Sequence, residues 1–146
     1  MNDEPRKPIP LRDSVPPSER PGEPTVEPGI ERVDDFIVEG PLLTDVGGTI
    51  GIKVLSTPGM IAVMERTSAV LSFENLPEGR ATVGFEVCVK HVSAAAEGAR
   101  CQARSTLREV VDGRKLRFDV EVKEGERTIG VGTHERRVIE VGQLGR

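Results

Sequence analysis

Apolar residues follow two different periods along this chain, and the change of period predicts two kinds of structure. From residue 55 to residue 71 the apolar positions fit a helical period, and residues 60–64 are apolar without interruption. This pattern predicts one helix whose apolar surface runs all the way round, which is typical of a buried helix. We expect the rest of the chain to be organised around it.

Both ends of this helix are marked in the sequence. Thr57 is a residue type that caps helix N-termini, and Pro58 would then occupy the first helical position, where its missing N–H costs nothing. Pro77 and Gly79 are expected to stop the helix near Asn75.

After the helix, apolar and polar residues alternate with a period of two, which predicts strands. A first strand and a loop with short extended pieces precede the helix, at residues 33–39 and 40–56. Four long strands follow it, at residues 81–92, 98–111, 115–123 and 127–141. We expect short turns to make these four strands antiparallel neighbours. The first of them should carry one shared face of Val83, Phe85, Val87, Val89 and His91.

The sequence predicts a long apolar helix followed by an antiparallel sheet with one apolar face. Both apolar surfaces are buried most simply if the sheet wraps the helix. The predicted fold class is therefore α+β, with the hot-dog layout of an antiparallel sheet around one central helix. Such a sheet leaves exposed edges, and pairing two sheets edge to edge would close them. We expect a homodimer or a dimer of dimers, with the functional site at the subunit boundary.

Residues 1–29 differ from the rest of the chain in composition. They hold eight of the eleven prolines, interspersed with charges. Such a segment cannot bury enough apolar surface to offset the entropy of ordering it. The sequence predicts a disordered, Pro-rich arm at 1–29 and one domain at 30–146.

Composition argues against several classes of function. The net charge is −4 and the chain has four Phe but no Trp or Tyr, which argues against a nucleic-acid partner. Cys88 and Cys101 lack the spacing of a zinc site and are expected to be reduced thiols of a cytoplasmic protein. No signal peptide is visible, and no apolar stretch approaches the roughly 18 residues of a membrane span. We expect no metal, no cofactor and no membrane partner.

Glu65 is the one carboxylate in the apolar part of the helix. Its neighbours three and four residues away, Ile61, Ala62, Ser68 and Ala69, carry no positive charge. Two interpretations remain open. Glu65 either lies on a solvated strip or is held where charge is poorly solvated, which would raise its pKa and suit acid–base chemistry.

An ordered set of residues resembles a known family. The set comprises Thr57, Glu65 eight residues later, Gly84, His91 and residues 132–136, which read Gly-Thr-His-Glu-Arg. Over about residues 30–141 the chain resembles the hot-dog thioesterases of the fluoroacetyl-CoA thioesterase type. The segment at 132–136 is the most specific part of this resemblance.

The resemblance implies an enzyme that hydrolyses an acyl-CoA thioester to the free acid and CoA. It implies a catalytic set of Thr57, Glu65 and His91, with Gly84 and Arg136 near the acyl or CoA binding region. The fluoroacetate-specific member carries phenylalanines on both sides of its threonine. Here the corresponding neighbours are Leu55, Ser56, Pro58 and Gly59, so a different small or medium acyl group is expected.

The chemistry of the residues agrees with this resemblance but leaves individual roles open. Free N–H groups at the helix N-terminus could polarise a thioester carbonyl. Glu65 could act as a general base or as a nucleophile. His91 could move a proton or be a structural histidine that bonds the backbone. The Thr57 hydroxyl could cap the helix or contact the substrate.

The roles of two residues near the C-terminus also remain open. His134 is expected to be a surface or structural residue, whereas Arg136 could pair with a CoA phosphate or lie on a solvated face.

Two functions other than hydrolysis also remain open. A hot-dog dimer could bind acyl-CoA without turnover. A hot-dog dehydratase or hydratase is less favoured, because the only histidines are His91 and His134, and neither precedes the Pro58-Gly59 pair.

Overall fold

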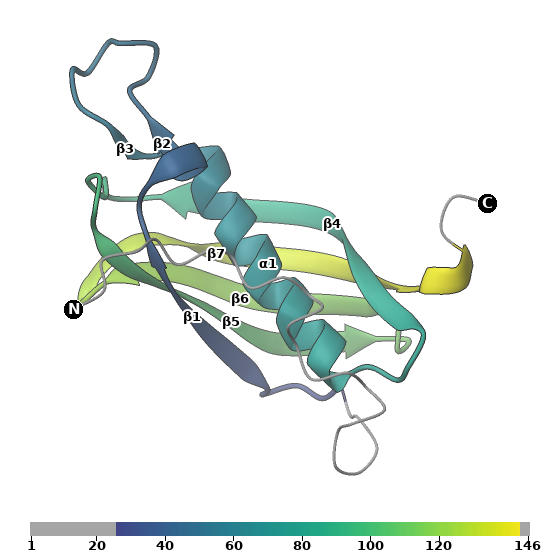
Figure 1. The fold of residues 1–146 in the computed structure, drawn as a ribbon. Helices are drawn as coiled ribbons and strands as arrows, with labels where there is room; N and C mark the ends of the chain where they lie inside the picture. Colours follow the sequence, from purple (N-terminus) through teal and green to yellow (C-terminus); the bar gives the residue numbers. More distant parts are fainter. Residues whose placement is uncertain (1–25, 144–146) are drawn as a thin grey trace, which may run out of the picture.

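The computed structural model describes residues 26–143 and places one long helix across a five-stranded antiparallel sheet (Figure 1). The helix is α1 (Thr57–Asn75), which ends where the sequence predicts. The sheet contains β1 (Glu31–Ile37), β4 (Arg80–His91), β5 (Arg100–Val111), β6 (Lys115–Glu124) and β7 (Arg127–Glu140). Two short strands pair before the helix, β2 (Leu43–Thr44) and β3 (Val54–Leu55). The 3₁₀ turns are η3 (Gly40–Leu42) and η4 (Val141–Gln143).

The order of the strands differs from the prediction at one point. The sheet runs β1-β5-β6-β7-β4, so β5, β6 and β7 are sequential neighbours as expected, but β4 pairs with β7 instead of β5. The connection over residues 92–99 is longer than a hairpin turn, and Ala95 within it is fully buried. It carries the chain from one side of the sheet to the other, which leaves β4 as an edge strand (Figure 1).

A tight turn joins β5 to β6, as the sequence predicts. Asp112 and Gly113 both have positive φ angles, 57° and 63°. They are the two central residues of a β-turn that the Arg114 N–H closes by donating to the Val111 carbonyl at 3.0 Å. Asp and Gly are residue types that adopt positive φ in such turns, which explains the pair.

A β-bulge in β4 overturns the predicted face of that strand. The pairing with β7 shifts between Gly84 and Glu86, so Phe85 is an extra residue. Val83 and Phe85 are 40% and 60% exposed, whereas Val89 packs against the core. Strict alternation would place Gly84 away from His91; the bulge brings both onto the helix-facing side.

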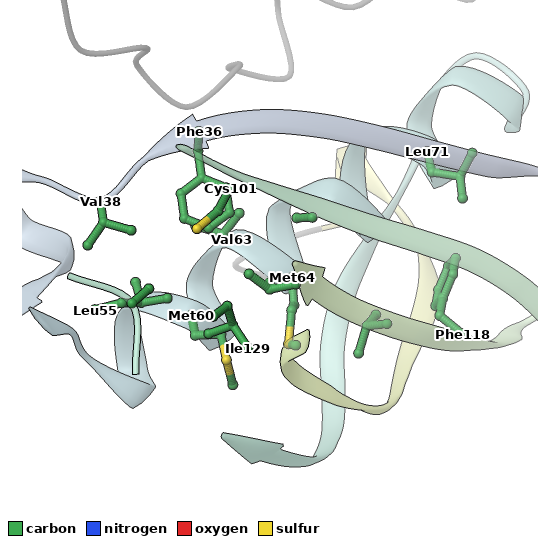
Figure 2. Packing of buried hydrophobic residues seen from close by; sticks show 14 of the residues in the cluster. Phe36, Val38, Leu55, Met60, Val63, Met64, Leu71, Cys101, Phe118 and Ile129 are labelled. Atoms are coloured by element: carbon green, nitrogen blue, oxygen red, sulfur yellow. The ribbon is translucent and has the colours of Figure 1, made fainter. Parts of the chain in front are cut away.

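The helix packs one side on the sheet and leaves the other open, so the prediction that it is buried all round is wrong for a single chain. Figure 2 shows Met60, Val63 and Met64 among core side chains of the sheet. Ala62 is exposed. Met60 sits directly over Gly130, where a Cβ would lie 2.3 Å from the methionine sulfur. Glycine at this position therefore lets the helix approach β7.

Buried polar contacts fix the helix against β1. Thr67 donates a hydrogen bond to the Asp34 carboxylate at 2.8 Å, and Arg32 pairs with Asp34 at 3.0 Å and with Glu74 at 2.7 Å. Because Asp34 is only 5% exposed, these partners satisfy a carboxylate that would be costly to bury alone.

Contacts with the domain begin before residue 30. Val26 packs against the core, and the Gly29 N–H donates to the Leu107 carbonyl at 2.8 Å. Residues 1–25, the rest of the predicted arm, lie outside the described residues. None of the helices within residues 26–143 combines the length and apolar character that a bilayer-spanning helix needs.

Candidate active site

Ser56, not Thr57, caps the N-terminus of α1. Its backbone is extended and its hydroxyl accepts a hydrogen bond from the Gly59 N–H at 2.9 Å. The prediction of Thr57 as the cap is wrong by one residue, because two adjacent hydroxyl residues both suit that position. Pro58 still lies in the first turn, where backbone N–H groups have no helical partner.

The Thr57 hydroxyl is therefore available for another contact. Its oxygen lies 2.9 Å from Nδ1 of His91, at the end of β4. The other ring nitrogen of His91 is buried and has no hydrogen-bond partner among the described residues. A histidine that bonds the backbone, one of the two interpretations of His91, is not what the structure shows. Thr57 and His91 form what we call the threonine pair.

Glu65 lies two turns further along α1 and faces β4 and β7. Its side chain is 40% exposed, so the carboxylate is not shielded from water within one chain. No cation within the helix contacts it; its partner is Arg136 of β7, whose Nη1 lies 3.7 Å from Oε2. A Cβ at Gly84 would stand 2.8 Å from the same carboxylate oxygen. Glycine in β4 thus makes room for the Glu65 side chain.

Arg136 is buried, at 6% exposure, so the alternative of a solvated face is wrong. Its Nε donates to the Thr82 hydroxyl at 2.7 Å and its Nη2 to the Thr82 carbonyl at 3.0 Å. Burial lowers the pKa of Arg136, and the negative charge of Glu65 opposes that shift. The guanidinium is a fixed, charged partner for the carboxylate.

His134 completes this cluster, although the sequence interpretation did not place it in the site. It is 3% exposed, its Nε2 lies 3.2 Å from Nη1 of Arg136, and its ring stacks on Phe118. Residues two apart in a strand share a face, so the spacing of His134 and Arg136 was a signal for their proximity. We call Glu65, Gly84, His134 and Arg136 the glutamate cluster.

The structure does not bring the expected catalytic trio together within one chain. Thr57 and Glu65 are eight residues apart on α1, a rise of about 12 Å. Gly84 and His91, which mark the two groups on β4, are seven residues apart, roughly 20 Å along a strand. The threonine pair and the glutamate cluster therefore lie apart from each other along α1 and β4. Within residues 26–143 no three His, Cys, Asp or Glu side chains are grouped to hold a metal ion.

A single long helix packed against a five-stranded antiparallel sheet defines a protein of the hot-dog class. Residues 42–142 match the family model described as fluoroacetyl-CoA-specific thioesterase, and the chain belongs to this family. A curated relative is the fluoroacetyl-CoA thioesterase of Streptantibioticus cattleyicolor, 34% identical over 87 residues. That alignment covers 60% of this chain and 62% of the relative, less than two thirds of its length.

Solved structures agree with the family assignment. The fluoroacetyl-CoA thioesterase FlK is similar with a TM-score of 0.72 and 27% identity, over 82% of this chain and 92% of that chain. A variant of FlK in complex with fluoroacetate and CoA gives a TM-score of 0.70 at 27% identity, over 82% of this chain and 100% of that chain. A hot-dog-like protein from Thermanaerovibrio acidaminovorans, 20% identical with a TM-score of 0.72 over 80% and 86%, shares the fold. The predicted α+β hot-dog class and the predicted family are confirmed.

Proposed function

We propose that this protein hydrolyses acyl-CoA thioesters to the free acid and CoA. The observation that carries the proposal is the Glu65 carboxylate, set beside Gly84 and 3.7 Å from a buried arginine, in a member of a thioesterase family. The arginine orients the carboxylate, and the missing side chain of Gly84 makes room for it beside β4.

Glu65 has two possible chemical roles in this reaction. As a general base it would take a proton from water as the water attacks the thioester carbonyl. As a nucleophile it would displace CoA to give a mixed anhydride, which water then opens. Both routes need the ionised carboxylate.

The threonine pair is suited to stabilise the carbonyl oxygen and the leaving group of the same reaction. The first turn of α1 presents backbone N–H groups and the positive end of the helix dipole, which stabilise negative charge on a carbonyl oxygen. Thr57 stands at this turn and His91 holds its hydroxyl at 2.9 Å. We propose that His91 passes a proton to the departing thiolate.

These two groups can act on one thioester if they come from different chains. β4 is an edge strand, and an edge strand presents unpaired backbone groups that a second chain can pair with. An antiparallel pairing of β4 with a second copy, centred near Cys88, would set Gly84 of one chain opposite His91 of the other. We therefore propose a homodimer, or a dimer of such dimers, in which each site combines one chain's threonine pair with the partner's glutamate cluster.

Assembly can be measured directly. We expect sedimentation or light scattering at micromolar concentration to give the mass of two chains or of four, because an unpaired β4 edge favours association. The mass of one chain under these conditions would contradict both the dimer and the shared site.

The acyl group is proposed to be small or medium in size, and different from fluoroacetyl. The residues beside Thr57 are Leu55, Ser56, Pro58 and Gly59, without the aromatic side chains of the fluoroacetate-specific member. A thiol-release screen across acyl-CoA chain lengths, with fluoroacetyl-CoA included, tests this choice. A clear maximum at fluoroacetyl-CoA would contradict it.

Binding of CoA can be separated from turnover. The chain contains no Trp or Tyr, so adenine dominates the ultraviolet absorbance of a complex. We expect a non-hydrolysable acyl-CoA analogue to comigrate with the protein on gel filtration and to raise its melting temperature. No binding at millimolar ligand would exclude hydrolysis. Binding with no thiol release from any acyl-CoA would instead support a non-catalytic acyl-CoA-binding module.

The cysteines support a cytoplasmic location as part of the proposal. Cys88 and Cys101 are both free thiols, as is usual where glutathione keeps proteins reduced. Burial raises the pKa of the Cys101 thiol to about 11, so Cys101 stays protonated and takes no part in the chemistry.

A further inference from the structure

The two nitrogens of the His134 ring face partners whose chemistry fixes which nitrogen carries the proton. Nδ1 lies 2.7 Å from the carbonyl oxygen of Glu86, which can only accept a hydrogen bond. Nε2 lies 3.2 Å from Nη1 of Arg136, which can only donate. Both contacts are satisfied at once by a neutral ring that is protonated on Nδ1 and has a lone pair on Nε2.

From this geometry we propose that His134 is a positioning residue: as a neutral hydrogen-bond acceptor it holds Arg136 at a distance from Glu65 that leaves the carboxylate free to react. This rests on the proposed function of Glu65. The charged groups that face His134 are Arg136 from β7 and Glu65 from α1. β4 contributes only the Glu86 carbonyl, and β6 contributes the Phe118 ring.

The remaining contacts of Arg136 show why the acceptor matters. Nε and Nη2 of Arg136 both donate hydrogen bonds to Thr82. Nη1 is therefore the nitrogen of the guanidinium that faces both His134 and Glu65. The Nη1 to Glu65 distance is 3.7 Å, longer than a charge-assisted hydrogen bond. Without an acceptor at position 134, Nη1 would be free to close on Glu65. A closer cation would make the carboxylate a weaker base.

The environment keeps His134 in this neutral form. Burial lowers the pKa of His134 from its ordinary value, and the positive charge of Arg136 lowers it further, against opposing contributions from the Glu86 carbonyl and Glu65. A protonated ring would place an N–H donor and a positive charge against the guanidinium.

The first experiment needs no turnover. The chain has two histidines, so a histidine-labelled ¹⁵N spectrum resolves His134 from His91, with a His91→Asn variant for assignment. We expect His134 to be neutral with the proton on Nδ1 at neutral pH, and to have a pKa lower than that of an ordinary histidine. In Arg136→Met its pKa should rise. A proton on Nε2, or a pKa that does not respond to Arg136→Met, would overturn the proposal.

The second experiment compares two substitutions kinetically. His134→Gln keeps an acceptor, whereas His134→Leu removes it at similar volume. We expect His134→Leu to lower kcat by about 10- to 100-fold with little change in KM, and to move the acid limb of the kcat profile to lower pH. His134→Gln should recover most of kcat and the wild-type acid limb.

A matched control separates positioning from packing. Phe118→Leu disturbs the ring that stacks on His134 but no polar contact. A merely structural role predicts that Phe118→Leu and His134→Leu change kcat alike and leave the acid limb in place, and that result would overturn the proposal. If wild-type protein releases no thiol, the proposed function fails, while the spectrum still decides the protonation state of His134.

Discussion

Replacing Glu65 with glutamine is expected to lower kcat by about 100-fold or more, because it removes the base or nucleophile of the proposed reaction. The amide has nearly the same shape as the carboxylate, and its oxygen can still accept from Arg136. The Glu65 side chain is 40% exposed, so the substitution buries no new polar group. The fold and the assembly should therefore survive. Initial rates of thiol release, with melting temperature measured in parallel, check this expectation.

Glu74→Gln is the matched control for this variant. Glu74 lies on the same helix and also pairs with an arginine, Arg32, at 2.7 Å. It is remote from both the threonine pair and the glutamate cluster. We expect kcat of Glu74→Gln to stay within about threefold of wild type. If Glu65→Gln also stayed in that range, Glu65 would not be the reacting carboxylate.

The sequence predicted the strands well because their side chains alternate strictly over long stretches. In β5 and β6 the buried positions follow a period of two, as at Cys101, Ala103, Leu116 and Phe118. Such alternation is a local property, and it marks both the element and its core face. The order of the strands is not local. β4 pairs with β7 because residues 92–99 carry the chain across to β5 on the far side of the sheet. The pattern of apolar residues does not indicate the path of such a connection.

The candidate site was predicted in its residues but not in its geometry. Gly84 appeared to lie on the opposite face from His91, because a β-bulge adds one residue without any compositional signal. Thr57 was predicted as the cap, but Ser56 is also a residue type that caps helices, and only the position of the helix decides between them. That one-residue difference matters chemically, since it leaves the Thr57 hydroxyl free for His91.

Buried polar residues of β7 were the hardest to interpret. Arg136 stands between Glu135 and Arg137 in a charged stretch that is typical of a solvated face. In the structure Glu135 and Arg137 pair with each other at 2.8 Å, whereas Arg136 turns inward to Thr82 and His134. The alternation of the strand separates these side chains, but the sequence does not say which face is inside when both carry charges.

A dimer made from one Thr57→Ala chain and one Glu65→Gln chain is expected to regain about half of the wild-type activity, although each variant alone is nearly inactive. In the proposed arrangement, one of its two sites combines the intact threonine pair of the glutamine variant with the intact Glu65 of the alanine variant. The other site carries both defects. Co-expression with two different affinity tags isolates the mixed dimer, and thiol release measures it.

The control pairs two defects from the same group. A mixed dimer of Thr57→Ala and His91→Asn should remain inactive, because Thr57 and His91 of one chain serve the same site and each site then carries one defect. If all three residues of one chain formed a site, neither mixed dimer would recover activity. Recovery by the first dimer and not by the second is therefore expected only when Glu65 reaches the thioester from the other chain. The rise of about 12 Å between Thr57 and Glu65 on one helix is the physical reason to expect it.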